Sequence, residues 1–292
     1  MAKLVQIIGV SHNPTVPARF GTPGEADHPG IPKAKERFRL MRGKLAEARP
    51  DVVLVIGNDH LNQLFMDNLP AFIIAKPDVM AGPPEYEVAN WGMPRYRVPV
   101  DVGLAKAFIR RGFEEGVDFA FSDEFTVDHS IVLPLHLTRP EADLPVVPLI
   151  TNVMAEPVAP ARRFYQVGEA LRRIIDGLPD GLRVAVVASG HLSTEVGAPK
   201  TFKRFLGEPD GCPDREFDEQ ALNILKKGDS AALLSLADPE RMRKAGNFTS
   251  GFLNFVLLSG MARGKAATQA EGVLTDTVSL AFLTWDLHKE AA

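Results

Sequence analysis

The sequence has almost no cysteine. Of its 292 residues, Cys212 alone carries a thiol, so the chain can form neither an internal disulfide nor a zinc site made of several thiolates. We therefore expect a reducing, cytoplasmic compartment. We also expect any metal to be bound by histidines and carboxylates.

Long apolar runs and blocks of positive charge are missing too. No apolar stretch approaches the roughly 18 to 20 residues that a membrane span needs. The start, MAKLVQIIGVSHNP, shows no signal-peptide cleavage pattern, and we expect it to form a first strand. The net charge is −4 and Lys and Arg are dispersed. These features exclude the basic surface of a nucleic-acid or anionic-membrane binder and favour a small-molecule partner.

Several common catalytic signatures are absent. The segment GVSHN lacks the last glycine of the G-x-S-x-G serine-hydrolase elbow. No phosphate-binding P-loop is present, and no G-x-G-x-x-G turn follows a strand-like segment. GNDH is similar to the Gly-Asn-His element of two-metal phosphoesterases, but their earlier Asp-x-His and their Gly-Asp pair are not found. The sequence therefore favours one metal over two.

The sequence does contain a regular alternation of strand-like and helix-like segments. This order predicts an α/β fold, with a central mixed sheet flanked by helices, and we expect residues 1–292 to form a single domain. The predicted strands are Lys3–Gly9, Asp51–Gly57, Ala71–Ala75, Val117–Phe121, Pro145–Ile150, Leu182–Ser189 and Val273–Trp285. The predicted helices are Lys33–Ala48, Val102–Glu115, Pro160–Asp176, Asp214–Lys227 and Phe252–Ala262. Two segments rich in proline and glycine, 21–32 and 76–99, are predicted to be loops.

Three predicted strands are each followed by glycine or serine and then by a histidine. The segments LVQIIGVSH, VVLVIGNDH and RVAVVASGH end at His12, His60 and His191. A single histidine after a strand is usually a turn or core residue, and we interpret His136, inside an apolar stretch, in that way. Because ligands bind at the carboxyl ends of strands in open α/β sheets, three such histidines can converge on one site. His129, in FTVDHSIVLPL, is a fourth candidate.

Converging imidazoles without thiolates indicate a metal site. Neutral imidazole is the commonest metal ligand, and two histidines with one carboxylate are typical of non-haem Fe(II) oxygenases. Histidines that do not bind the metal can act as acid or base near neutral pH. The pattern alone predicts a histidine-rich site for one metal, with at least one imidazole left for proton transfer.

The chain resembles the class III extradiol ring-cleavage dioxygenases, the LigB-type family typified by the catalytic subunit of protocatechuate 4,5-dioxygenase. The motifs GVSHNP, NDHLNQLFMDNLPAFIIA, VDHSIVLPL and ASGHLS, and the later EFD and RKAGN segments, carry the resemblance across nearly the whole chain. It implies a single catalytic α/β domain. It also implies an oxidoreductase that uses O2 to open a hydroxylated aromatic ring beside a diol, in aromatic compound catabolism.

The resemblance also implies roles for the four histidines. His12 and His60 match the two histidine ligands of Fe(II), for which another divalent metal is the alternative. His191 matches the catalytic base that takes a proton from a ring hydroxyl, and His129 matches a second active-site histidine near the substrate. Family members commonly form oligomers, so we expect a homo-oligomer or a hetero-oligomer with a related subunit.

The glutamate that serves as the family's third metal ligand is missing. Its position corresponds to Gly251 in RKAGNFTSGFLNFVLLSG, and no carboxylate occurs from Gly246 to Gly260. Glu240 is the nearest acid upstream, but Asp-Pro-Glu is an ordinary helix start. If the position is vacant, a substrate carboxylate can fill it, and Gly251→Glu should tighten metal binding.

Three functions therefore remain open. They are ring cleavage, non-oxidative metal-dependent hydrolysis or decarboxylation of an aromatic acid, and a non-catalytic role as partner subunit of an active paralogue. Arg95, Tyr96 and Arg97 are candidates to hold a substrate carboxylate, with a solvated loop as the alternative. Asp59 and Asp128 are candidates to orient a neighbouring imidazole.

Overall fold

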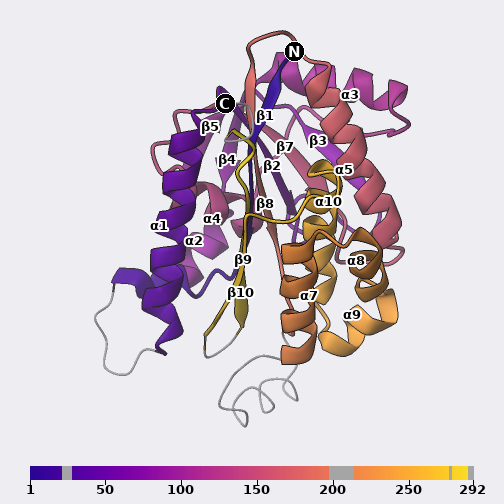
Figure 1. Ribbon diagram of the computed structural model, residues 1–292. Helices are drawn as coiled ribbons and strands as arrows, with labels where there is room; N and C mark the ends of the chain where they lie inside the picture. The colour runs from indigo at the N-terminus through magenta and orange to yellow at the C-terminus, as the bar shows by residue number, and fades with distance from the viewer. Residues whose placement is uncertain (22–27, 197–213, 276–277, 289–292) are drawn as a thin grey trace.

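In the described part of the chain, eight strands form one mixed sheet between two layers of helices, and the central strands are rich in valine, isoleucine and leucine (Figure 1). The computed structural model describes residues 1–21, 28–196, 214–275 and 278–288, so Cys212 lies outside the described residues. The strands in chain order are β1 (Lys3–Ser11), β2 (Val52–Asn58), β3 (Phe72–Ala75), β6 (Ala120–Ser122), β7 (Val146–Thr151), β8 (Arg183–Gly190), β9 (Gln269–Leu274) and β10 (Ser279–Trp285).

The centre of the sheet is parallel and its margins are mixed. The strand order is β6-β3-β7-β2-β8-β1-β10-β9, and β7, β2, β8 and β1 are parallel neighbours. On one side β10 and β9 continue the sheet in antiparallel fashion, and on the other side β3 runs antiparallel to β7. The carboxyl ends of β2, β8 and β1 therefore lie side by side.

Burial on both faces explains why these strands are apolar without alternation. All seven residues of β2 are buried. Leu54 and Ile56 belong to the core on one face, whereas Val53 and Val55 belong to the core on the other, because successive side chains of a strand point to opposite faces.

Helices cover both faces of the sheet. The helices are α1 (Gly30–Ala48), α2 (Glu85–Trp91), α3 (Val102–Glu114), α4 (His129–Thr138), α5 (Ala161–Asp176), α7 (Arg215–Lys227), α8 (Ser230–Leu236), α9 (Pro239–Ala245) and α10 (Leu253–Met261), with the 3-10 turns η1 (Pro17–Gly21) and η2 (Thr249–Phe252). One face packs against α1 and α4, and the other against α3, α5, α7 and α10 (Figure 1). Among the described residues, no helix is both long and apolar enough to cross a membrane.

The structure confirms the predicted α/β class and the mixed sheet. The predicted helices are all present to within a few residues. The last predicted strand is wrong in one respect: Val273–Trp285 contains the end of β9 and all of β10, which form an antiparallel pair. The predicted strand Val117–Phe121 is also displaced and shortened to Ala120–Ser122.

The prediction of two loops needs correction. The segment 76–99 contains β4 (Val79–Gly82), α2 and β5 (Tyr96–Pro99), and β4 pairs with β5 in a separate two-stranded sheet. These elements are too short for a clear periodicity in the sequence, and their contacts with the rest of the fold stabilise them. Of the segment 21–32, residues 30–32 belong to α1 and residues 22–27 lie outside the described part of the chain.

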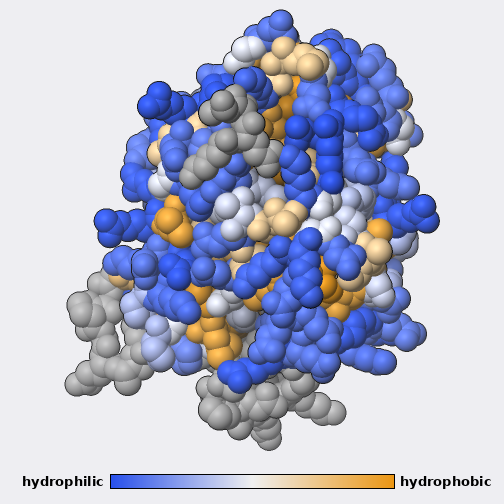
Figure 2. All heavy atoms as spheres, viewed as in Figure 1, coloured by the Kyte–Doolittle hydropathy of each residue, from blue (hydrophilic) through white to orange (hydrophobic). Residues whose placement is uncertain are grey.

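The outer surface carries apolar residues in separate patches. Figure 2 shows a face that is mostly hydrophilic, with the apolar groups divided among several places. Phe65 and Met66, in the segment that follows β2, are among the exposed large apolar residues, at 54% and 69% exposure.

Candidate metal centre

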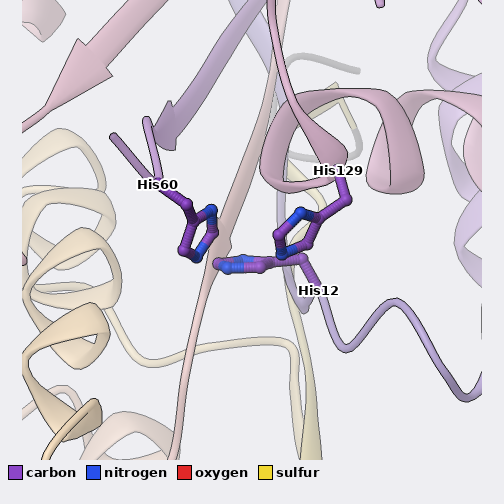
Figure 3. Close-up of side chains that lie close together, drawn as sticks. All are labelled: His12, His60 and His129. Carbon is purple, nitrogen blue, oxygen red and sulfur yellow. The ribbon is translucent and has the colours of Figure 1, made fainter. Parts of the chain in front are cut away.

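Four histidines from four separate segments meet beyond the carboxyl ends of the central strands. His12 follows β1, His60 follows β2, His191 follows β8 and His129 is the first residue of α4. The ring centroids lie 4.1 Å apart for His12 and His191, 4.3 Å for His60 and His129, and 5.3 Å for His12 and His60. Figure 3 shows the rings of His12, His60 and His129 pointing toward one another. One ligand atom from each of these three lies within 4.8 Å of the other two.

His60 is held on its outer side by the buried carboxylate of Asp128. Asp128 Oδ2 lies 2.9 Å from His60 Nδ1 and accepts the backbone N–H of His60 at 2.7 Å. The other ring nitrogen, Nε2, lies 3.2 Å from Asn58 Nδ2. Burial acts to lower the pKa of His60, but the charges of Asp128, Glu87 and Asp59 raise it above its ordinary value. The pKa of Asp128 is lowered by His60 and His129, although burial opposes this.

His129 is held in the same way by a second buried carboxylate. Glu87 Oε1 lies 2.7 Å from His129 Nδ1, and Glu87 Oε2 accepts the backbone N–H of His129 at 2.9 Å. The Glu87 side chain has no exposed surface. A carboxylate on Nδ1 fixes the ring orientation and leaves Nε2 as the free nitrogen, as in metal-binding histidines.

His12 is fully buried, and neither of its ring nitrogens has a hydrogen-bond partner among the residues that the structure describes. Burial, together with the charges of the other three histidines, lowers its pKa well below the ordinary value, so the ring is neutral. A buried polar atom without a partner costs about 1–3 kcal/mol. A metal ion among the three rings would give such a nitrogen a partner, so these residues fit a bound cation.

His191 lies next to His12 and packs against Gly251. A Cβ atom at position 251 would lie 2.7 Å from His191 Cδ2, closer than real Cβ contacts. Burial, with the charges of His60 and His129, lowers the pKa of His191 to about 3. The imidazole is therefore neutral at physiological pH.

Comparison with known proteins identifies the family of the chain. The profile of the family described as the catalytic LigB subunit of aromatic ring-opening dioxygenase matches residues 6–281. This chain belongs to that family. Its resemblance to the LigB-type extradiol dioxygenases is thus confirmed at the level of the family.

Curated relatives of this LigB-family chain carry the name 2,3-dihydroxyphenylpropionate/2,3-dihydroxicinnamic acid 1,2-dioxygenase. The protein from Azotobacter vinelandii is 33% identical over 159 residues, which cover 54% of this chain and 48% of the relative. The protein from a Rhodococcus species is 29% identical over 215 residues, which cover 73% of this chain and 63% of the relative. The chain thus spans about half to two thirds of the length of these relatives.

A solved structure of an uncharacterized protein from Escherichia coli K12 shares the fold. It superposes with a TM-score of 0.56 and covers 96% of this chain and 99% of its own, at 13% sequence identity. This likeness supports the architecture alone.

Gly251 stands at the position of the family's third ligand in this LigB-family chain, and a vacant coordination position there stays a prediction. The imidazole of His191 occupies the space beside Gly251, so a glutamate side chain introduced there would collide with it. Glu240 is exposed in the first turn of α9, whose start Asp238 caps by accepting from the N–H groups of Glu240 and Arg241. Glu240 is therefore an ordinary residue of a helix start, as its local sequence indicates.

The candidates for binding a substrate carboxylate lie outside the histidine cluster. Arg95 is exposed and pairs with Glu85, and Arg97 is exposed on β5. Tyr96 is buried and donates its hydroxyl to the Arg139 carbonyl oxygen. Both arginines are solvated, as in the alternative, but Arg97 lies on a strand rather than in a loop.

The two aspartates that precede histidines have different tasks. Asp128 does orient an imidazole, but it is that of His60 and not that of its sequence neighbour His129. Asp59 orients no imidazole, because its carboxylate accepts the backbone N–H groups of Asn62, Gln63 and Leu64 and so shapes the turn after β2.

Sequence reasoning missed Glu87 entirely. Glu87 lies in the segment that was predicted to be a loop, and no spacing in the sequence connects it with His129, 42 positions away. A buried acid can be recognised only once α2 is packed against α4. Two aromatic rings near the cluster were also missed: Trp91 meets His129 edge-on at 5.3 Å, and Phe248 is stacked with His60 at 6.2 Å.

Proposed function

We propose that this chain is a metal-dependent extradiol dioxygenase, which opens a hydroxylated aromatic ring next to its diol with O2. One observation carries the proposal: a fully buried His12, whose two ring nitrogens have no partner in the described part of the chain, faces two imidazoles that carboxylates hold from behind. Membership of the LigB family and the names of the curated relatives supply the class of reaction. The ordered carboxylate partners argue against a degenerate, non-catalytic subunit.

His12 and His60 are proposed as metal ligands, and Fe(II) as the metal. His12 offers a nitrogen without a partner among the described residues, and His60 offers Nε2, which would exchange its 3.2 Å contact with Asn58 Nδ2 for the metal, because Asp128 holds Nδ1. A bound Fe(II) would supply the Lewis-acid and redox chemistry of ring opening. Imidazole ligands also suit other divalent metals, so the identity of the metal is part of the proposal.

His191 is proposed as the general base. Its ring lies 4.1 Å from that of the proposed ligand His12, centroid to centroid, and is neutral, so it has an unprotonated nitrogen beside the proposed metal. It would take the proton of a substrate hydroxyl as the diol approaches the metal. Contact with Gly251 fixes the ring in this place.

The substrate ring is proposed to lie among the neighbouring aromatic side chains. Phe248 is stacked with His60, and Trp91 meets His129 edge-on, so both flank the proposed metal centre. Flat apolar rings favour an aromatic substrate by burial and by stacking. The names of the relatives make 2,3-dihydroxyphenylpropionate a first compound to try.

Anaerobic reconstitution with Fe(II), followed by oxygen uptake, tests this function. The panel is 2,3-dihydroxyphenylpropionate, other catechols, gallates and aminophenols, with spectroscopic detection of the ring-opened product. We expect uptake with at least one diol. Metal binding without any uptake would favour non-oxidative hydrolysis or decarboxylation, and absence of metal binding would favour a partner subunit.

Substitutions test the roles of the histidines. We expect His12→Ala and His60→Ala to lose metal, and His191→Ala to retain metal while kcat falls by at least about 100-fold, the lower range for loss of a general base. Metal content and single-turnover rates are the measurements. Wild-type metal content in both ligand variants would remove those two assignments.

The domain organisation, the assembly and the cellular compartment are also part of the proposal. We propose one catalytic domain over residues 1–292, in a cytoplasmic homo-oligomer or in a complex with a related subunit. Family resemblance supports the assembly, and a single cysteine supports a reducing compartment. Light scattering of the purified chain, alone and with a related subunit, tests the assembly.

A further inference from the structure

We propose that His129, held in place by Glu87, is the third protein ligand of the metal, so that the centre has three histidines and no carboxylate in contact with the ion. This inference rests on the proposed metal site and concerns which side chains bind the ion.

His129 repeats the arrangement of the proposed ligand His60. In each residue a carboxylate accepts both from the backbone N–H and from ring Nδ1: Asp128 for His60, and Glu87 for His129. The two rings are stacked, 4.3 Å apart and 17° from parallel, and both face His12 (Figure 3). A carboxylate behind Nδ1 is the usual support of a metal-binding imidazole. The same support on both rings indicates the same task.

Within the described ranges, the two buried carboxylates near the cluster are both engaged and not free to take the third position. Asp128 Oδ2 accepts from His60 twice and from Asn62 Nδ2 at 3.0 Å, and its Oδ1 accepts from Ser130 N. Both oxygens of Glu87 are used by His129. Across the described ranges, the two sets of side chains close enough to hold a cation are His12–His60–His129 and Glu87–Asp128–His129. The second set consists of His129 and the two carboxylates that already accept hydrogen bonds from His60 and His129.

Charge also favours a cation between these rings. Asp128 and Glu87 have fully buried side chains, and in the described parts of the chain their ion-pair partners are His60 and His129, with no Lys or Arg. Buried carboxylates without a positive partner are costly. A divalent ion bound by three neutral imidazoles would balance two carboxylates, each one imidazole away. The negative charge of this centre would thus come from Asp128 and Glu87, which contact the ligating imidazoles rather than the metal.

X-ray absorption of the Fe(II)-loaded wild-type protein, prepared without oxygen, tests the ligand count directly. Imidazole rings give a characteristic multiple-scattering pattern, and we expect three of them. A count of two imidazoles with the remaining positions filled by oxygen would overturn the proposal. This measurement requires no variant and no turnover.

Metal affinity of variants gives the second test. We expect His129→Ala to lower Fe(II) affinity by at least about tenfold, and Glu87→Gln to lower it about 10- to 100-fold, as for other carboxylate supports of ligating histidines. His191→Ala, in the same cluster, and His136→Ala, on the same helix, are matched controls that should keep wild-type affinity. Chelator competition measures the affinity, and circular dichroism verifies folding.

The outcomes separate this inference from the proposed function. Loss of metal in His12→Ala and His60→Ala, with wild-type affinity in His129→Ala, would leave the metal site standing and refute the role of His129. Failure of the wild-type protein to bind Fe(II), Co(II) or Zn(II) would refute both. Weaker binding in His129→Ala and Glu87→Gln, with unchanged controls, would support the three-histidine centre whether or not a ring-cleavage substrate has been found.

Discussion

At the scale of single residues, Asp128 links a helix start to the orientation of an imidazole. Its Oδ1 caps α4 by accepting from Ser130 N at 2.8 Å, and its Oδ2 accepts from both the backbone and the ring of His60. Because the two oxygens have separate partners, a change at this position affects the helix and the proposed ligand together.

We predict that Asp128→Asn lowers metal affinity by about 10- to 100-fold. An amide has only one acceptor oxygen, and its NH2 group would face N–H donors that the Asp128 carboxylate accepts from in the wild type. Titration with Fe(II) under argon measures this. Asp101→Asn is the matched control: Asp101 caps α3 through Leu104 N, away from the histidines. Asparagine is a good cap, so the control should keep both its metal affinity and its stability. Equal affinity in Asp128→Asn and wild type would contradict the role assigned to this carboxylate.

At the scale of elements, the end of β8 and the turn η2 approach so closely that only glycine fits at the contact. A Cβ on Gly190 would lie 2.6 Å from the carbonyl oxygen of Gly251, and a Cβ on Gly251 would meet the His191 ring. Two glycines thus fix the place of the proposed base.

Gly190→Ala should destabilise the fold by about 1–3 kcal/mol, the usual cost of an added methyl group in a packed contact. Gly43→Ala is the control. Gly43 lies within α1 with open space around its Cβ position, and alanine there should add about 0.5–1 kcal/mol of stability. Urea unfolding measures the change in the free energy of unfolding of both variants. A Gly190→Ala protein as stable as wild type would refute the close contact.

Gly251→Glu should not tighten metal binding. The new side chain has to displace the His191 ring, so we expect turnover to fall at least tenfold while Fe(II) affinity does not rise. Single-turnover kinetics and chelator competition measure the two quantities. A tighter metal site with retained turnover would instead show that the ring can move aside and the carboxylate can bind.

At the scale of the whole molecule, a buried ion pair joins the two ends of the chain to the first helix. Asp286, just after β10, pairs with Lys44 of α1 and accepts from Gln6 of β1 at 2.9 Å. Burial acts to raise the pKa of Asp286, but these hydrogen bonds and the Lys44 charge lower it below the model-compound value of 3.8.

A carboxyl group whose pKa is lower in the folded state stabilises the fold above its unfolded pKa, and the stabilisation is lost as the pH falls through the folded pKa. We therefore expect Asp286→Asn to lower the free energy of unfolding by about 2 kcal/mol at pH 7. The difference from wild type should shrink below pH 4. Urea midpoints at pH 7 and pH 3 give the comparison, and a difference independent of pH would show that packing rather than charge holds this junction.

The sequence by itself determined the α/β class, the central strands and the set of histidines. Strands buried on both faces must be apolar throughout, so β1, β2 and β8 are visible as runs of valine, isoleucine and leucine. Polar residues that follow such runs lie at the carboxyl edge of the sheet. Each of these residues can be recognised from the few residues that precede it in the sequence.

The tertiary structure alone decided which groups support those histidines. Glu87 reaches His129 only because α2 packs beside α4, and Asp128 turns to His60 rather than to its sequence neighbour because the cap of α4 faces the end of β2. The His191 ring packs against Gly251, a contact that the sequence does not predict. Such contacts join residues tens of positions apart, and they arise from packing, which local periodicity does not encode.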